Sequence, residues 1–339
     1  MMRGFSFFSD ISAHSCAHPE DTLLNIISSF PNVRTASLTT HDKIRHMADG
    51  KTKSLIALLI SIMIWSASFI GTKIAQRSFT PLTLCFIRTA LAALIMLGLR
   101  IAAGKPMHLA EQDRRPVFLS ALFGITIYYS LENLGVSMTT AGNASIITAV
   151  YPITTLLTGA MFFHERIRLK QMYGILIAIA GIVILTSDPV GGGGSRALAG
   201  NLLLLFNGFM WGFYNFLTQK VSAETDTSAL TFFQTIAGAV LLVPVLLLDL
   251  PIHVGPVTPA VALALLFLAA GCSVGAYFLY NIGLRGVSAG TAASMLNLMP
   301  VFGLVFSRLI LHETIAARQI AGAALVIAGV LLSLWIERR

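Results

Sequence analysis

The chain has 339 residues, of which 55% are hydrophobic and only 11% carry a formal charge. A soluble domain normally carries about 25% charged residues, so this composition suits a surface that faces lipid rather than water. The net charge of +8 does not indicate a nucleic-acid partner. Lys and Arg stand in short clusters between apolar stretches, not along one face with interleaved aromatic residues. Composition therefore predicts an integral membrane protein whose partner is the lipid bilayer.

Cysteine spacing and short motifs argue against redox, metal and enzyme chemistry. Cys16, Cys85 and Cys272 form no disulfide framework and no paired metal-ligand spacing. The run Gly50–Thr52 resembles the end of a nucleotide-binding loop, but Arg45 stands where the first glycine of that loop is required. The paired histidines of a zinc protease are missing from the sequence. Two Gly-x-Ser-x-Gly patterns occur, but Gly271–Gly275 lies inside a predicted helical span and Gly286–Gly290 at the start of the next, and neither follows a strand as a nucleophile elbow does. We therefore expect no enzyme activity, no cofactor and no metal.

Long apolar runs predict an all-α membrane protein with ten spanning helices, because a helix needs about 20 apolar residues to cross a bilayer. Pro81 and Pro116 mark helix starts, where a missing N–H costs little. The glycine-rich run 188–197 is predicted to be a flexible linker between the fifth and sixth spans. The predicted spans are 54–75, 81–102, 116–135, 140–162, 169–187, 198–219, 228–248, 259–283, 288–311 and 316–336.

The distribution of Lys and Arg predicts the orientation in the membrane. If the N-terminus is inside, most basic residues fall in inner segments, among them Arg100, Arg114 and Arg285. Outer loops, such as the one that holds Arg196, contain few. This asymmetry predicts a multi-pass protein of the cytoplasmic or inner membrane with both termini in the cytoplasm.

Residues 1–50 differ from the rest because they are polar and contain no continuous apolar stretch. They are therefore not expected to be a secretory signal. Two interpretations stay open. The segment is a disordered tail, or translation begins at Met47, which leads directly into the first span.

The chain contains an internal repeat, which appears when the sequence is laid over itself. One register aligns many rare residue types, with only a small change in the earliest part. Each copy holds five spans, an odd number, so the second copy, 198–336, enters the membrane from the side opposite to the first, 54–187. Two inverted five-helix repeats are the design of secondary carriers, in which exchanging the conformations of the two copies alternates access. The aligned pairs include Trp65 and Trp211, Tyr129 and Tyr277, Asn133 and Asn281, and Pro152 and Pro300.

The same segments resemble the EamA domain of the drug/metabolite transporter superfamily, in both copies and over about residues 54–336. This resemblance implies a secondary transporter, although members of the superfamily carry very different solutes. One departure affects the candidate site, since Gln234 stands at the second-copy position equivalent to Arg88. The segments that carry the resemblance are Tyr128–Gly135, Thr140–Ser145 and Tyr151–Pro152, and again Tyr277–Leu284, Ser288–Gly290 and Leu298–Pro300.

Two charged residues inside predicted spans are the proton-coupling candidates, because an intramembrane charge is costly unless it is paired or wetted. Glu132 can exchange a proton or bind a substrate amine, or it can simply reach water or a donor near the end of its span. Arg88 can bind an anionic group with its planar fork of donors. Equally, it can pair with Glu132 or with helix-end carbonyls in a structural role.

Amides and aromatic residues at equivalent places in the two copies suit a central cavity with apolar and hydrogen-bonding walls. The alternative for the amides is a structural role between helices, at about 0.6 kcal/mol each. The predicted substrate-binding residues are Trp65, Tyr128, Glu132, Asn133, Asn143, Trp211, Asn215, Tyr280, Asn281 and Asn297.

Pro152 and Pro300 fall near the middle of the fourth and ninth predicted spans. A proline there removes a backbone hydrogen bond and bends its helix. We predict hinges at these two positions, with a static kink as the alternative.

These features together predict a secondary active transporter. It is expected to export a small metabolite, amino acid or amphipathic compound by alternating access, driven by a proton or solute gradient. Its partner would be a small-molecule solute, and a homodimer is a candidate assembly. The alternative function is a membrane scaffold or interaction protein with the same fold and no transport.

Overall fold

The computed structural model describes residues 40–139, 144, 147–166, 169–185, 195–252, 254–311 and 317–337. The chain divides into two units, Met1–Met47 and Ala48–Arg339. The first unit contributes only the start of one helix to the described residues, and the account below concerns the second. The predicted tail up to residue 39, the glycines of the predicted linker and Asn143 lie outside the described residues.

The regular structure of the described chain is helical in both copies of the repeat, apart from one isolated antiparallel bridge between Phe79 and Val254. In the first copy the elements are α2 (Thr40–Ser66), α3 (Ser68–Ala75), α4 (Pro81–Ala102), α5 (Glu111–Ala121), the π-helical segment η1 (Leu122–Ile127), α6 (Tyr128–Met138), the 3₁₀ turn η2 (Thr148–Val150), α8 (Tyr151–Phe162) and α9 (Leu169–Leu185).

The second copy has the corresponding elements. They are α10 (Ser195–Gln219), α11 (Thr227–Leu246), the 3₁₀ turn η3 (Leu247–Asp249), α12 (Pro259–Leu266), the π-helical segment η4 (Phe267–Ala276), α13 (Tyr277–Leu284), α14 (Ala289–Met295), the 3₁₀ turn η5 (Leu296–Leu298), α15 (Met299–Leu311) and α16 (Ala317–Glu337).

Six continuous helices of the described residues are long and apolar enough to cross a membrane. They correspond to the first three predicted spans of each copy, so the membrane character is confirmed. Two shorter apolar helices, Met172–Gly181 and Ile320–Leu332, lie in the last helix of each copy. The six long helices are Gly50–Ala75, Pro81–Ala102, Glu111–Met138, Ser195–Gln219, Thr227–Asp249 and Pro259–Leu284.

Pro152 and Pro300 stand where helices begin, each as the second residue of its helix, α8 or α15. Each helix follows a short 3₁₀ turn, η2 or η5. A proline in the first turn of a helix has no N–H to leave unsatisfied, so these residues divide their predicted spans into shorter pieces. A moving hinge at either proline stays a prediction.

The π-helical segments η1 and η4 occupy equivalent positions in the two copies, since the register that aligns Tyr129 with Tyr277 carries Leu122–Ile127 into Phe267–Ala276. Each interrupts the third helix of its copy. π-helical segments are rare in proteins, and those that do occur often lie at functional sites. The apolar run predicted a plain helix here. A π-helical turn lies within the same apolar run, so the pattern of hydrophobic residues does not reveal it.

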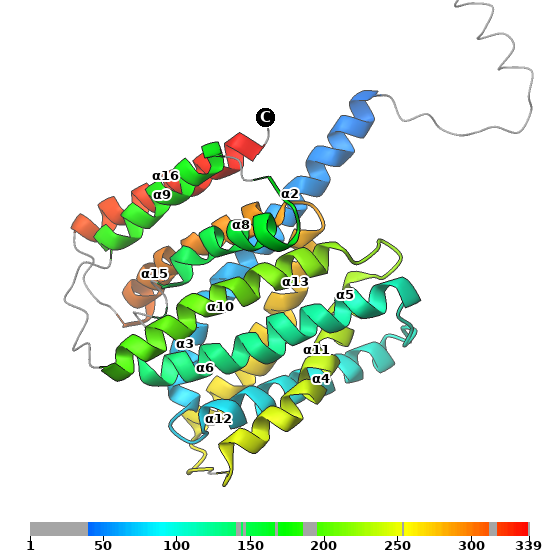
Figure 1. Ribbon diagram of the computed structural model, residues 1–339, viewed down its shortest axis with the longest axis vertical. Coiled ribbons are helices and arrows are strands. Elements are labelled where there is room, and N and C mark those ends of the chain that lie inside the picture. Colours follow the sequence, from blue (N-terminus) through cyan, green and yellow to red (C-terminus); the bar gives the residue numbers. More distant parts are fainter. Residues whose placement is uncertain are drawn as a thin grey trace, which may run out of the picture. The chain divides into compact units, whose positions relative to one another are not determined.

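α9 and α16 pack side by side and run antiparallel (Figure 1). Gly181 contacts Gly322, whose carbonyl oxygen would lie 2.7 Å from a Cβ built on Gly181. Gly329 contacts Gly174 in the same way, at 2.5 Å. The later glycine of each helix thus meets the earlier glycine of the other. The repeat register converts the first contact into the second, as expected where a pseudo-two-fold axis relates the two copies.

Two aspartates tie a loop of one copy to a helix of the other. Asp113, near the start of α5, is 1% exposed. It accepts hydrogen bonds from the Ser222 amide (2.9 Å), the Ser222 hydroxyl (2.7 Å) and the Thr225 hydroxyl, all in the loop before α11. Beyond the other end of α11, Asp249 accepts from the amide of Thr83 at 2.8 Å and from nearby threonine hydroxyls. Loops at both ends of α11, in the second copy, are therefore anchored to helices of the first copy.

Asp113→Ala is expected to lower the free energy of unfolding by about 2 kcal/mol, because it leaves a buried amide and two hydroxyls without their charged acceptor. Thermal or denaturant unfolding in detergent measures the change. Glu111→Ala is the matched control on the same helix, since the Glu111 side chain is 85% exposed. An equal effect of the two substitutions would contradict the anchoring role of Asp113.

Candidate functional site

Aromatic rings from both copies meet at the centre of the bundle. The rings of Trp65 and Trp211, equivalent residues of the two copies, lie 5.3 Å apart in an edge-to-face arrangement. Tyr129 and Tyr277 form a second equivalent pair, at 6.0 Å. Because equivalent residues can touch only beside the axis that relates them, this cluster lies on the pseudo-two-fold axis.

A small cavity of about 30 Å³ opens beside this aromatic cluster. This is space for one or two waters and far less than a metabolite occupies. Within the described residues, its walls contain one positive and one negative side chain among aromatic, hydroxyl and apolar groups. The lining residues are Trp65, Ser68, Phe69, Arg88, Tyr128, Tyr129, Glu132, Thr148, Tyr151, Trp211, Tyr277, Leu296 and Met299.

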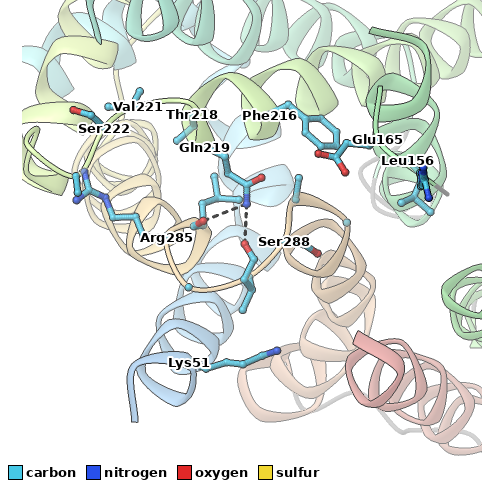
Figure 2. A pocket seen from close by; sticks show the side chains of 17 residues that line it. Lys51, Leu156, Glu165, Phe216, Thr218, Gln219, Val221, Ser222, Arg285 and Ser288 are labelled. Carbon is cyan, nitrogen blue, oxygen red and sulfur yellow. Dashed lines mark hydrogen bonds between the residues drawn. The ribbon is translucent and has the colours of Figure 1, made fainter. Parts of the chain in front are cut away.

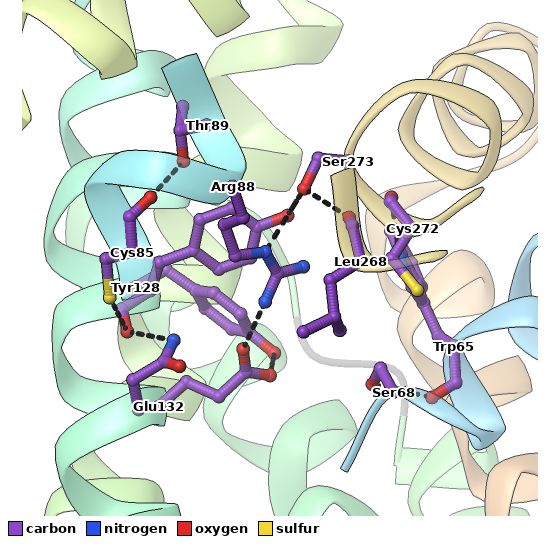
Figure 3. A network of polar contacts seen from close by, with 12 residues as sticks. Trp65, Ser68, Cys85, Arg88, Thr89, Tyr128, Glu132, Leu268, Cys272 and Ser273 are labelled. Carbon is purple, nitrogen blue, oxygen red and sulfur yellow. Dashed lines mark hydrogen bonds and ion pairs between the residues drawn. The ribbon is translucent and has the colours of Figure 1, made fainter. Parts of the chain in front are cut away.

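Arg88 and Glu132 form a buried but loose ion pair (Figure 3). Arg88 Nη1 lies 3.7 Å from Glu132 Oε2, and the two residues are 1% and 7% exposed. Tyr128 donates to Glu132 Oε1 at 3.3 Å. Among the described residues, Arg88 Nη1 has no hydrogen-bond partner. A charge-assisted hydrogen bond is normally about 2.7–2.9 Å long, so this pair is in contact without being fully engaged.

Arg88 is held from its other side by the second copy and by an aromatic ring. Its Nε donates to the Ser273 hydroxyl at 3.3 Å, and its guanidinium lies 4.0 Å from the centre of the Tyr129 ring. Ser273 belongs to the π-helical segment η4 and also contacts the Tyr129 hydroxyl, at 3.0 Å. Sequence reasoning missed Ser273, because a serine in an apolar run does not reveal which side chain it will contact until the helix that holds it is packed.

The equivalent region of the second copy is uncharged and fully hydrogen-bonded. Gln234, which replaces Arg88, donates to Ser120 at 2.8 Å and to Thr218 at 3.0 Å. Asn281 donates to the Gln234 side-chain oxygen at 2.9 Å and accepts from the Tyr214 hydroxyl at 2.6 Å. These groups satisfy one another, so this side of the axis works as a structural network.

The structure brings only part of the predicted substrate-binding set to the cavity. Trp65, Tyr128, Glu132 and Trp211 line it, as does the proton-coupling candidate Arg88. The remaining described members lie outside the lining: Asn133, Asn215, Tyr280, Asn281 and Asn297.

Most of those remaining members bond to protein. Asn133 and Asn215 donate to carbonyls one turn earlier, at 2.8 and 2.9 Å, and Tyr280 donates to Asn215 at 2.9 Å. Asn297, in η5, is 0% exposed, and neither polar atom of its side chain has a hydrogen-bond partner among the described residues.

An open vestibule of about 780 Å³ lies at one end of the bundle (Figure 2). Gln219, the last residue of α10, closes part of it by donating to the carbonyls of Leu284 (3.2 Å) and Val287 (2.7 Å). Glu165 and Arg285 also line this space. These contacts join the end of α10 to the loop after α13.

A second open hollow, of about 540 Å³, lies at the opposite end. It is lined by Lys73, Arg77 and Arg196, among other residues. Arg196 and Gln219 stand at opposite ends of α10, a helix of 25 residues that spans about 37 Å. Trp211, on the same helix between these two residues, lines the central cavity, and the three spaces share no described lining residue.

An apolar helical bundle with two repeats, and a buried charge pair beside their common axis, define a membrane carrier. The profile of the EamA-like transporter family matches the chain twice, over residues 52–187 and 198–335. The chain therefore belongs to the EamA-like transporter family, within the drug/metabolite transporter superfamily.

Relatives of known sequence are similar over most of their length. An "Uncharacterized transporter" of Archaeoglobus fulgidus is 29% identical, over 84% of this chain and 98% of the relative. A "Probable terminal-alkyne amino-acid exporter" of Streptantibioticus cattleyicolor is 28% identical, over 85% and 94%. A "Probable amino-acid metabolite efflux pump" of Salmonella typhimurium is 25% identical, over 84% and 96%.

A solved crystal structure described as "Crystal structure of protein" matches with a TM-score of 0.68 and 19% identity. The match covers 85% of this chain and 98% of the other. At this level of identity the likeness establishes the fold alone.

Proposed function

We propose that this transporter exports small amphipathic amino-acid metabolites by alternating access, with the central cavity as its binding site. The observation that carries the proposal is the position of the cavity. It lies beside the axis that relates the two copies, and its walls combine an ion pair with aromatic rings. The printed names of two relatives, an amino-acid metabolite efflux pump and an amino-acid exporter, support this class of solute.

The proposed topology has ten crossings in the cytoplasmic or inner membrane, with both termini in the cytoplasm. The six long helices supply six crossings, and α8, α9, the pair α14–α15, and α16 supply four more. The asymmetry of Lys and Arg supports this orientation. It places the vestibule beside Gln219 on the cytoplasmic side. A homodimer is the proposed assembly.

The proposed transport cycle begins from an occluded conformation, because a cavity of about 30 Å³ cannot hold a metabolite. Opening toward the vestibule requires α10 and α13 to separate at the Gln219 contacts. The first turns of α8 and α15, which contain Pro152 and Pro300, are the proposed hinges. The predicted residues outside the lining, Asn143 included, are proposed to reach the solute in other states of the cycle, and a proton or solute gradient supplies the driving force.

Uptake of labelled amino acids and derivatives into proteoliposomes tests the proposal. Wild-type protein is expected to give flux that saturates, and Trp65→Ala and Glu132→Gln are each expected to lower it at least tenfold, because both side chains form the cavity wall. Trp335→Ala is the matched control, since Trp335 is 51% exposed on α16.

Absence of flux for every solute, with Trp65→Ala and Glu132→Gln harmless in cells, would instead support the scaffold function.

A further inference from the structure

We infer that the solute of the central cavity is a zwitterion, whose carboxylate binds Arg88 while its ammonium group binds Glu132. The inference rests on the proposed function and specifies its substrate class. The solute would separate the two side chains. Arg88 would then pair with the carboxylate of the solute instead of with Glu132, and Glu132 would pair with the ammonium group instead of with Arg88.

The first argument is that the ion pair is incomplete. The two charges face the cavity at a separation of 3.7 Å, which is longer than a charge-assisted hydrogen bond. Arg88 Nη1 is buried and donates to no described residue. A guanidinium presents five donors in a rigid fork that matches a carboxylate, so Arg88 retains capacity for a second anion.

The second argument is charge balance. A buried charge that loses its partner costs several kcal/mol. An anionic solute that binds Arg88 would leave Glu132 unpaired, and a cationic solute that binds Glu132 would leave Arg88 unpaired. A neutral solute has no charge with which to replace either partner. A zwitterion alone can separate the pair and leave every charge with a partner.

The third argument concerns shape. Arg88 and Glu132 are close enough that the charges of one small molecule can reach both, as in an α-amino acid, where one carbon joins the ammonium and carboxylate groups. Most of the rest of the wall is aromatic, with Trp65, Tyr151 and Trp211 among its rings. It therefore suits an apolar side chain, and an ammonium group beside such rings gains further attraction.

The asymmetry of the two copies sets the orientation of the solute. The residues equivalent to Arg88 and Glu132 are Gln234 and Tyr280, which carry no charge and bond to neighbouring side chains. The cavity therefore offers one positive and one negative group, both from the first copy. One zwitterion binds, in one orientation.

Thermal stabilisation of purified wild-type protein tests charge selection with four probes: L-phenylalanine, L-leucine, 3-phenylpropanoate, which lacks the amine, and phenethylamine, which lacks the carboxylate. A ligand that binds only the folded state raises the melting temperature. We expect stabilisation by the two amino acids, and at least tenfold weaker binding of both single-charge analogues. Equal or tighter binding of either analogue, or stabilisation by neither amino acid, overturns the inference.

Two substitutions test which group binds which charge. Glu132→Gln removes the negative group and is expected to shift preference toward 3-phenylpropanoate, whereas Arg88→Gln is expected to shift it toward phenethylamine. An unchanged order of affinity in folded variants overturns the assignment. If either variant does not fold, the double variant Arg88→Gln/Glu132→Gln replaces it. The double variant is expected to lose the preference of the wild type for phenylalanine over its analogues, and retention of that preference overturns the assignment.

Flux measurements separate failure of this inference from failure of the proposed function. If wild-type proteoliposomes transport phenethylamine or 3-phenylpropanoate at the same rate as phenylalanine, the transport function stands and the inference of a zwitterionic solute is refuted. Proteoliposomes without flux of any solute would refute the transport function itself.

Discussion

Arg88→Met is expected to lower the free energy of unfolding by about 3–5 kcal/mol, because it leaves the Glu132 carboxylate buried without its positive partner. Both residues are almost inaccessible, and the other polar contact of Glu132 within the described part of the chain is the Tyr128 hydroxyl at 3.3 Å. The substitution also removes the donor to Ser273 and the cation over the Tyr129 ring. Denaturant unfolding in detergent micelles measures the loss.

The double variant Arg88→Met/Glu132→Leu separates the ion pair from simple packing. Replacing both partners of a buried pair by apolar residues is often close to neutral, so the double variant is expected to be about 2 kcal/mol more stable than Arg88→Met alone. Strictly additive losses would show that the two side chains are not coupled. In that case the contact between Arg88 and Glu132 would contribute nothing to stability.

Gly181→Ile is expected to destabilise the protein by about 3 kcal/mol, because it forces α9 and α16 apart. A Cβ on Gly181 would lie 2.6 Å from the Val326 amide nitrogen and 2.7 Å from the Gly322 carbonyl oxygen. Both atoms belong to the backbone, so no side-chain rotation relieves the overlap, and overpacking at such a contact typically costs about 1–3 kcal/mol. The melting temperature in detergent reports the effect.

Pseudo-symmetry supplies a second variant for the same test. Gly329→Ile is expected to have a similar effect, since its Cβ would lie 2.5 Å from both the Ala178 amide nitrogen and the Gly174 carbonyl oxygen. Gly303→Ala is the control, because a Cβ there meets nothing within 4 Å. Tolerance of isoleucine at Gly181 but not at Gly329 would contradict the symmetric packing of the two helices.

The difference between the two copies has a consequence for transport. The first copy places a charge pair in the cavity wall, and the second places a neutral, saturated network of Gln234, Asn281 and Tyr214 on the other side of the axis. In the proposed binding mode, solute recognition rests on the first copy, while the symmetric glycine contacts of α9 and α16 involve both copies. A carrier of this design can exchange two equivalent conformations and still bind its solute in a single orientation.

Several features followed from sequence periodicity alone. Runs of about 20 apolar residues predicted membrane-crossing helices, because a helix in lipid must bury its own backbone hydrogen bonds. The repeat register predicted which residues are equivalent, and the contacts of Trp65 with Trp211 and of Gly181 with Gly322 agree with it. The resemblance carried by Tyr128–Gly135 predicted the family, which the two profile matches confirm.

Other features depended on three-dimensional packing. Sequence distance says nothing about whether a polar side chain faces a cavity or a neighbouring helix. Asn133 and Asn281 occupy equivalent positions, yet Asn133 bonds within its own helix and Asn281 joins a network between helices. Ser273 became recognisable as a partner of Arg88 only once the π-helical segment η4 was packed against α4.

Composition and the repeat thus determined the membrane environment, the helical class and the doubled plan, because these depend on local hydrophobicity and on residue register. Tertiary structure decided that Arg88 and Glu132 pair with each other in the wall of a cavity of about 30 Å³, while the amides predicted beside them bond mostly to protein. The physical reason is that a buried polar group takes whichever partner the assembled helices bring within about 3 Å. That choice depends on packing between residues far apart in the chain.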